Sequence, residues 1–163
     1  MSSRRRSRWA KKAGTDVLLV CSSGGHLLEL YALRDAWEGR SRAWVTFDKS
    51  DARSLLRDEE AVYARWPTER NIANLFRNLV LAWRVTGKHR PRVVVSTGAG
   101  IAVPFSWVAR LRGAHVVYIE SLARIDKPSL SCRLLRPAAD RIYVQWPELA
   151  ESYDSARYAG TVV

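Results

Sequence analysis

Apolar runs of strand length alternate along the chain with segments in which apolar residues recur at helical spacing. Valine, isoleucine, leucine and aromatic residues dominate the short runs, which is typical of buried strands. Strands are therefore expected at 16–21, 42–47, 61–65, 91–96, 114–119 and 140–145, with 157–163 as a seventh candidate. Helical segments fall between them, at 27–37, within 48–58, and at 69–86, 105–112 and 129–135. This alternation predicts βαβ units, and so a single Rossmann-like α/β domain with a mostly parallel, doubly wound sheet.

The segment 69–86 carries the strongest helical pattern in the sequence. Its apolar residues recur at i, i+3, i+4, i+7, i+8 and i+11, namely Ile72, Leu75, Phe76, Leu79, Val80 and Trp83. Gly87 follows as a suitable C-cap, and Asp48 or Ser50 is suited to cap the shorter helix within 48–58. On general grounds the apolar stripe should cover one face of the sheet. The alternative is a basic amphipathic helix that lies on a membrane, with Trp83 at the interface.

Positive charge is concentrated at the N-terminus of a chain that is long enough for one domain with its own core. Of the 163 residues, 47% are apolar, and the formal net charge is +11. Six basic residues lie within the first twelve positions, which hold no acid: Arg4, Arg5, Arg6, Arg8, Lys11 and Lys12. We expect residues 1–15 to form a flexible basic arm and 16–163 to form the folded domain. The arm is either a solvated tail or a segment attracted to an anionic surface such as phospholipid or nucleic acid.

The remaining composition argues against several other classes of protein. Two cysteines, Cys21 and Cys132, give no disulfide framework, and a buried Cys21 suits a reducing, cytoplasmic setting. No apolar run approaches the ~18 residues that span a bilayer, and the basic start is not followed by the apolar region of a signal peptide. His, Cys and acidic residues do not cluster at metal-ligand spacing, so no metal site is expected.

Three polar clusters follow expected strands, at 22–26, 96–100 and 120–124. Because ligands bind beyond the carboxyl ends of the strands in such a sheet, the fold should bring these clusters to one edge. The first two clusters are glycine loops, which permit positive φ and the close approach of a phosphate to backbone N–H groups. Neither loop is a P-loop, and neither has the clean G-x-G-x-x-G spacing of a dinucleotide site. A tight turn between strand and helix also needs glycine, so each loop alone is equally consistent with a structural role.

His26 and Glu120 are the candidate chemical groups. His26 follows the first glycine loop at a helix start, where a general base is well placed, whereas His89 lies in a basic loop and His115 near a strand start. Glu120 ends an expected strand. Its alternative roles are to accept hydrogen bonds from a sugar, to orient the second glycine loop, or to form a salt bridge with Arg124.

Five motifs in chain order resemble one family of glycosyltransferase subunits. They are Ser22-Ser-Gly-Gly-His26, Ser96-Thr-Gly-Ala-Gly-Ile-Ala-Val-Pro104, Tyr118-Ile-Glu-Ser121, Ser129-Leu-Ser131 and Val144-Gln-Trp-Pro-Glu-Leu149. The family comprises the membrane-associated subunit of the eukaryotic enzyme that adds the second GlcNAc to dolichol-diphosphate-GlcNAc, and the PssD-like proteins of bacterial capsule and exopolysaccharide synthesis. The resemblance covers about residues 16–163. The family is similar in turn to the N-terminal, acceptor-binding half of MurG-like GT-B glycosyltransferases.

The resemblance implies one half of an inverting glycosyltransferase. The acceptor is a polyprenyl-diphosphate-linked saccharide, the donor is a UDP-sugar held by a separate PssE-like subunit, and no cofactor is implied. His26 matches the histidine of the family's Gly-Gly-His motif and is the expected base, and Glu120 is the second residue assigned to catalysis. Acceptor and phosphate binding is assigned to the strand-end loops, at Ser22, Ser23, Gly24, Gly25, Thr97, Gly98, Gly100 and Ser121. The alternative role is a non-catalytic membrane anchor that recruits the donor-binding subunit.

Membrane attachment is expected to be peripheral. Eukaryotic members of the family carry an N-terminal transmembrane helix, and this chain has a polyarginine segment there instead. Since stable peripheral attachment usually takes two weak signals, we expect the arm to act together with the 69–86 helix. The residues assigned to membrane binding are Arg4, Arg5, Arg6, Phe76 and Trp83. This interpretation favours lipid over nucleic acid as the partner of the arm, and places the protein on the cytoplasmic face of the cell membrane.

Overall fold

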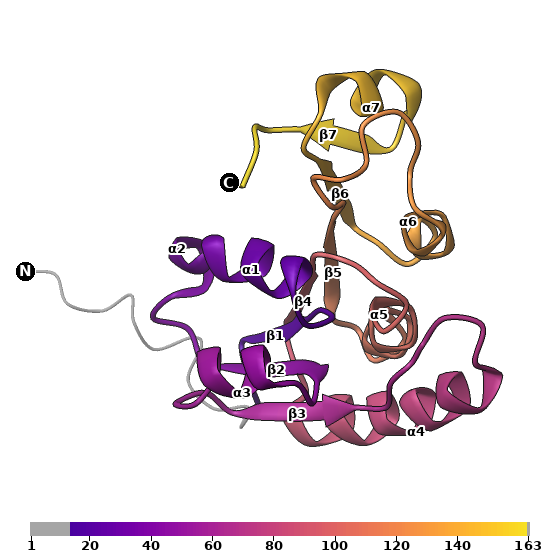
Figure 1. Cartoon of the computed structure of the whole chain (residues 1–163). Coiled ribbons are helices and arrows are strands. Elements are labelled where there is room, and N and C mark those ends of the chain that lie inside the picture. The colour runs from indigo at the N-terminus through magenta and orange to yellow at the C-terminus, as the bar shows by residue number, and fades with distance from the viewer. Residues whose placement is uncertain (1–13, 163) are drawn as a thin grey trace, which may run out of the picture.

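The computed structural model describes residues 14–162, which form one α/β domain around a single sheet (Figure 1). All seven strands run parallel, in the order β3-β2-β1-β4-β5-β6-β7. The strands are β1 (Val17–Val20), β2 (Arg42–Phe47), β3 (Ala61–Ala64), β4 (Val93–Ser96), β5 (His115–Ile119), β6 (Arg141–Val144) and β7 (Ala156–Tyr158). The predicted fold class is confirmed, and the sheet is parallel throughout.

Helices cover both faces of the sheet. In the described part of the chain they are α1 (Gly25–Ala32), α2 (Arg34–Trp37), α3 (Ser50–Leu55), α4 (Ile72–His89), α5 (Ala102–Leu111), α6 (Leu130–Leu135) and α7 (Pro147–Ser152). β1 shows how the two layers arise, because successive side chains of a strand point to opposite faces. Leu18 and Val20 pack into the core beneath α4 and α5, whereas Val17 and Leu19 pack into the core beneath α1, α2 and α3.

The strand order reverses at the centre of the sheet. The chain moves outward from β1 to β2 and β3, then returns along α4 to place β4 on the other side of β1 (Figure 1). Val20 at the end of β1 pairs in register with Val45 of β2 and with Ser96 of β4. The carboxyl ends of β1 and β4 therefore lie level, while β2 extends on to Phe47, and these ends lie at the point where open α/β sheets bind ligands.

The helices on the α1 side differ in detail from the expectations. The helix expected at 27–37 is two helices, α1 and α2, that are separated at Leu33. Neither Asp48 nor Ser50 caps α3, which has no side-chain cap. Asp48 forms an ion pair with Arg53 instead, and Ser50 is already the first residue of the helix.

The other helices differ mainly at their ends. α4 continues through Gly87 to His89, and Arg90 forms its C-cap in the left-handed conformation, at φ 43°. α5 begins earlier than expected, with Pro104 in its first turn, where the missing N–H leaves no bond unmade. α7 was not expected, although Pro147 at its first position is a favourable start.

The face of α4 that was expected to cover the sheet is exposed. We define the α4 stripe as the residues that form this face, whose exposed fractions lie between 41% and 71%: Ile72, Leu75, Phe76, Leu79, Val80 and Trp83. The buried side of α4 is formed instead by Asn74, Asn78, Ala82, Val85, Thr86 and His89. The expectation that the stripe packs on the sheet is therefore wrong. Spacing identified a continuous face, but the loop before α4 needs the amide side chains of the opposite face for its backbone hydrogen bonds.

Two further expectations concern membranes and thiols. Arg4, Arg5 and Arg6 lie outside the described residues, so their role in a basic arm stays a prediction. Within residues 14–162, no helix is both long and apolar enough to cross a bilayer. Cys21 and Cys132 are buried free thiols, and burial raises the pKa of Cys21 to about 12.

Candidate functional site

The three polar clusters meet in one cleft of about 1120 Å³ at the carboxyl end of the sheet, which we call the central cleft. The predicted site residues that line it are Ser22, Ser23, His26, Gly100, Glu120 and Ser121. Four other predicted residues do not line it: Gly24, Gly25, Thr97 and Gly98. The fold thus brings the clusters together as expected, but part of each glycine loop does not line the cleft.

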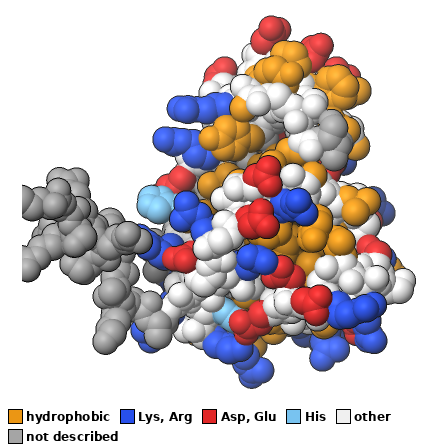
Figure 2. Space-filling model, turned by 90° about the vertical axis from the view of Figure 1, so that its left-hand side faces the viewer, with side chains coloured by type: hydrophobic (Ala, Val, Ile, Leu, Met, Phe, Trp, Pro, Cys, Tyr) orange, Lys and Arg blue, Asp and Glu red, His pale blue; other side chains and the backbone are white. Residues whose placement is uncertain are grey.

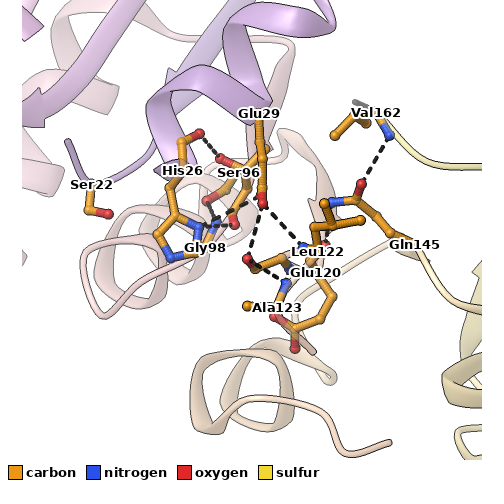
Figure 3. Close-up of polar contacts among 12 residues, drawn as sticks. Ser22, His26, Glu29, Ser96, Gly98, Glu120, Leu122, Ala123, Gln145 and Val162 are labelled. Atoms are coloured by element: carbon orange, nitrogen blue, oxygen red, sulfur yellow. Dashed lines mark hydrogen bonds and ion pairs between the residues drawn. The ribbon is translucent and has the colours of Figure 1, made fainter. Parts of the chain in front are cut away.

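His26 lies in the first turn of α1, and its imidazole contacts the second glycine loop (Figure 3). Its Nδ1 lies 2.8 Å from the backbone oxygen of Thr97, and the Thr97 hydroxyl donates to the His26 carbonyl at 2.6 Å. A carbonyl oxygen can only accept, so Nδ1 carries a proton, and in the neutral imidazole the lone pair is on Nε2. The side chain is 29% exposed and lines the central cleft, which leaves Nε2 as the nitrogen that can take a proton there.

Gly98 allows the imidazole to pack closely against the second glycine loop. Its φ is 119°, and a Cβ at this position would lie 3.1 Å from Tyr118 Oη and 3.2 Å from His26 Cε1. Gly100 does not adopt positive φ, and a Cβ there would lie 3.1 Å from Thr68 Oγ1. The absence of a side chain at Gly98 makes room for the His26 ring, and its absence at Gly100 makes room for Thr68.

Two of the backbone amides expected to bind phosphate are engaged within the protein. The Gly24 N–H donates to Asp51 Oδ2 at 2.7 Å, and the Gly98 N–H donates to Ser96 Oγ at 3.1 Å. Gly24 has the expected positive φ, at 78°, whereas Gly25 does not. Phosphate binding by these loops stays a prediction, and at Gly24 it requires the displacement of Asp51.

Glu120 is buried and organises the loop that follows β5. Its Oε1 accepts from the Ser121 N–H at 3.1 Å and from Tyr118 Oη at 3.2 Å, and its Oε2 accepts from the Ser129 N–H at 2.8 Å. Burial, followed by this carboxylate, raises the pKa of Tyr118 well above its ordinary value. Within residues 14–162, Glu120 forms no salt bridge with Arg124, so that alternative is wrong. Glu120 thus orients the loop that follows β5, whereas one of its predicted roles was to orient the second glycine loop.

The last of the five motifs, residues 144–149, is hydrogen-bonded to the same loop. Gln145 Nε2 donates to the backbone oxygen of Glu120 at 3.1 Å, and its Oε1 accepts from the Val162 N–H at 3.0 Å (Figure 3). Trp146 Nε1 donates to the backbone oxygen of Leu122 at 2.6 Å. The end of β6 therefore fixes the position of the loop that carries Ser121.

The fold adds groups to the site that the sequence did not indicate. Lys49 and Arg70 bring positive charge to the central cleft, and Lys49 Nζ lies 4.6 Å from the centroid of the Trp66 ring. These residues come from separate loops, so no spacing along the chain could reveal them. Glu29 contacts His26, and here a signal did exist, because residues three apart share a helix face.

The central cleft continues to the first turn of α4. Ile72 and Leu75 line the cleft, and both belong to the α4 stripe. The Arg112 guanidinium stacks on Trp83 at 4.0 Å, farther along the helix. A groove of about 870 Å³ beside the helix is lined by Tyr63, Arg65, Phe76, Arg77, Val80, Leu81 and Arg84. An apolar surface flanked by arginines thus leads away from the cleft.

A second cavity, of about 720 Å³, lies on a face of the sheet between α2 and the C-terminal segment. Figure 2 shows hydrophobic side chains in the middle of this face, among charged residues. Its floor is formed by Val93, Val95, Val117 and Ile119, and it contains none of the predicted site residues. Among the described residues, no three His, Cys, Asp or Glu side chains are grouped so that they could share a metal ion.

Comparison with known sequences identifies relatives over most of the chain. The family model "Oligosaccharide biosynthesis protein Alg14 like" matches residues 62–162. The UDP-N-acetylglucosamine transferase subunit ALG14 of Candida albicans is 29% identical over an alignment 169 positions long, which covers 89% of this chain and 77% of that protein. The subunit of the same name from Yarrowia lipolytica is 38% identical over 92 residues, which cover 53% of this chain and 43% of that protein.

Solved structures share the fold. MurG of Acinetobacter baumannii matches with a TM-score of 0.72 at 16% identity, covering 90% of this chain and 45% of MurG. UDP-N-acetylglucosamine 2-epimerase from Rickettsia bellii matches with a TM-score of 0.69 at 11% identity, covering 91% of this chain and 45% of the epimerase. This chain thus spans about half the length of these proteins, as expected for one half of a MurG-like fold. The family match covers more than half of the sequence, and the chain belongs to the Alg14-like family of oligosaccharide biosynthesis proteins.

Proposed function

We propose that this chain is the acceptor-binding subunit of a two-component UDP-N-acetylglucosamine transferase. Its acceptor is a polyprenyl-diphosphate-linked saccharide, in the assembly of a lipid-linked oligosaccharide or exopolysaccharide, and a PssE-like subunit binds the donor. The names of the relatives, which are transferase subunits, support both the reaction class and a partner subunit. One observation carries the proposal: His26 presents Nε2 to a cleft that continues to the α4 stripe.

His26 acts as the general base in this proposal. Nε2 takes the proton of the acceptor hydroxyl while that oxygen attacks the anomeric carbon of the UDP-sugar. The new C–O bond forms as the bond to UDP breaks, UDP leaves with the electron pair, and the configuration inverts. The Thr97 carbonyl holds the Nδ1–H, and so maintains the tautomer in which Nε2 is free. General base catalysis of this kind contributes about 10²–10⁴-fold.

The walls of the central cleft suit an acceptor of mixed character. The hydroxyl groups of Ser22, Ser23 and Ser121 face a saccharide, and Lys49 and Arg70 supply charge for a diphosphate. The lipid leaves the cleft along the α4 stripe, which begins at Ile72 and Leu75. Glu120 takes the role of orienting the loop that carries Ser121.

Transfer is tested with the reconstituted pair of subunits, a short-chain polyprenyl-diphosphate-GlcNAc acceptor and radiolabelled UDP-GlcNAc. We expect His26→Ala to lower kcat by about 10²–10⁴-fold while assembly with the partner is unchanged. The matched control is His115→Ala, because His115 is an exposed histidine at the opposite end of the central sheet. Near-normal turnover of His26→Ala would show that this chain does not supply the base, and would favour the non-catalytic membrane anchor.

Peripheral attachment to the cytoplasmic face of the membrane is the second part of the proposal. The α4 stripe enters the interface, with Phe76 and Trp83 as its largest side chains, and flanking arginines attract anionic headgroups. In flotation with neutral and anionic vesicles, Phe76→Ala/Trp83→Ala should weaken binding to both. Tyr158→Ala, which removes an exposed aromatic residue on β7, is the control. Unchanged flotation of the double variant would refute this surface.

A further inference from the structure

Glu29 is a buried carboxylate on α1, one turn after His26 (Figure 3). Its Oε1 accepts from Ser121 Oγ and from the Leu122 N–H, both at 3.1 Å. Its Oε2 is buried, has no hydrogen-bond partner within the described residues, and lies 3.9 Å from His26 Nδ1. Burying a carboxylate oxygen without a hydrogen-bond partner lowers the stability of the fold, so a negative charge at this position is not explained by stability alone.

The two oxygens of Glu29 have separable roles. Oε1 joins α1 to the loop after β5, but a neutral amide oxygen would accept the same two hydrogen bonds. The negative charge is therefore not needed for this tie. Oε2 faces His26, and the ion pair that the structure records for Glu29 is with this imidazole.

The charge of Glu29 matters at the moment when His26 becomes an imidazolium. Removal of a proton from the acceptor hydroxyl places a positive charge on the His26 ring. The Glu29 side chain is only 11% exposed, so water screens its interaction with that charge weakly. The Nδ1–H is already bonded to the Thr97 carbonyl. Orientation of the ring and stabilisation of its charge are thus divided between a carbonyl and a carboxylate.

We infer that Glu29 is a positioning residue that acts through His26, stabilising the imidazolium with Oε2 while Oε1 holds the Ser121–Leu122 loop against α1. This inference rests on the proposed role of His26 as the base. It assigns to one side chain both the electrostatic support of the base and the placement of a wall of the acceptor cleft.

Two variants separate the roles in the reconstituted two-subunit enzyme. Glu29→Gln keeps the acceptor for Ser121 and Leu122 but removes the charge, and we expect kcat to fall about 10–100-fold with the acceptor KM within about twofold. Glu29→Asp keeps the charge but shortens the reach to the loop, and we expect a higher kcat than for Glu29→Gln together with a raised acceptor KM. Glu151→Gln is the matched control, because Glu151 is exposed on α7.

The comparison with His26→Ala makes the outcomes distinct. If Glu29 acts through His26, the double variant His26→Ala/Glu29→Gln is no slower than His26→Ala alone. Normal kcat in Glu29→Gln beside an inactive His26→Ala would overturn the inference and leave the proposed base intact. Normal kcat in His26→Ala would overturn the proposed base itself. Two other results would also overturn the inference: a lower kcat for Glu29→Asp than for Glu29→Gln, or a loss of thermal stability that accounts for the lower kcat of Glu29→Gln. In either case Glu29 would only hold the loop in place.

Discussion

Gly98→Ala is the substitution whose effect follows most directly from the geometry of the site. Gly98 lies between His26 and Tyr118, in a backbone conformation with φ 119° that side chains rarely adopt. The methyl group would lie 3.1 Å from Tyr118 Oη and 3.2 Å from His26 Cε1. Tyr118 is buried and held by Glu120 and Ser129, so it cannot move aside.

Two costs add in this variant. The strained backbone costs about 1–3 kcal/mol, and an overpacked methyl group in a close-packed interior costs about 1–3 kcal/mol. Together they amount to about 2–6 kcal/mol, a large part of the roughly 5–15 kcal/mol by which a domain is stable. If the His26 ring gives way instead of the fold, its hydrogen bond to Thr97 is lost and turnover falls.

Urea unfolding followed by tryptophan fluorescence measures the first effect, and the transfer assay measures the second. Gly113→Ala is the control, because Gly113 has φ +86° and no atom within 4 Å of the place where the new methyl group would lie, so it carries the backbone cost alone. We expect Gly98→Ala to be less stable than Gly113→Ala by about 1–3 kcal/mol. Equal free energies of unfolding and normal turnover would refute the close packing of His26 on this loop.

Three further predictions test other contacts. Asn78→Ala should lower the free energy of unfolding in urea by about 2–4 kcal/mol, because the Arg65 backbone N–H and carbonyl, which bond to Asn78 at 2.8 and 2.9 Å, lose their partners. Leu79→Ala, on the exposed face of α4, should change it by no more than about 0.5 kcal/mol, and the reverse order would contradict the observed orientation of α4. Asp140→Asn should lower the free energy of unfolding by about 1–2 kcal/mol at pH 7 and by less at pH 3. Burial acts to raise the pKa of Asp140, but the Val116 N–H and Arg110 outweigh it, so the pKa is lowered in the folded state. The wild type therefore loses this stabilisation as the pH falls below about 4 and through the folded pKa. Urea midpoints at both pH values check this, and an effect that does not shrink in acid would count against the ion pair. Lys49→Ala and Arg70→Ala should each weaken the binding of inorganic pyrophosphate about tenfold, as measured by calorimetry. Arg57→Ala, at an exposed residue outside the cleft, is the control, and pyrophosphate affinities equal to that of the wild type would exclude Lys49 and Arg70 as phosphate ligands.

The sheet was predictable because each strand carries its own signal. The run at 42–47 matches β2 at both ends, and glycine or proline bounds several of the others. No single run encodes the strand order, but regular alternation with helices leaves few arrangements. Once the sheet is parallel, the clusters after β1, β4 and β5 must share one edge, so His26 and Glu120 could be placed near each other from the sequence alone.

Contacts between distant segments were not predictable. The orientation of α4 depends on Asn74 and Asn78, which bond to the backbone of Pro67 and Arg65 in the loop before the helix. An apolar stripe is a stronger pattern than two amides, so local periodicity favoured the wrong face. Glu29 likewise meets partners 92 and 93 positions away, and only the folded chain shows that its carboxylate lies between His26 and the loop after β5.

A helix that is held by its polar side leaves its apolar side free to vary. In the proposed membrane attachment, substitutions in the α4 stripe change the affinity of this surface for a bilayer. They have little effect on folding, because the stripe contributes little to the core. On the same proposal, the hydrophobicity of the part of the stripe beyond the central cleft, from Phe76 to Trp83, can be adapted to membranes of different composition while the cleft keeps its shape. In water without lipid or detergent, the exposed apolar side chains of the stripe make it the surface through which copies of this protein should aggregate.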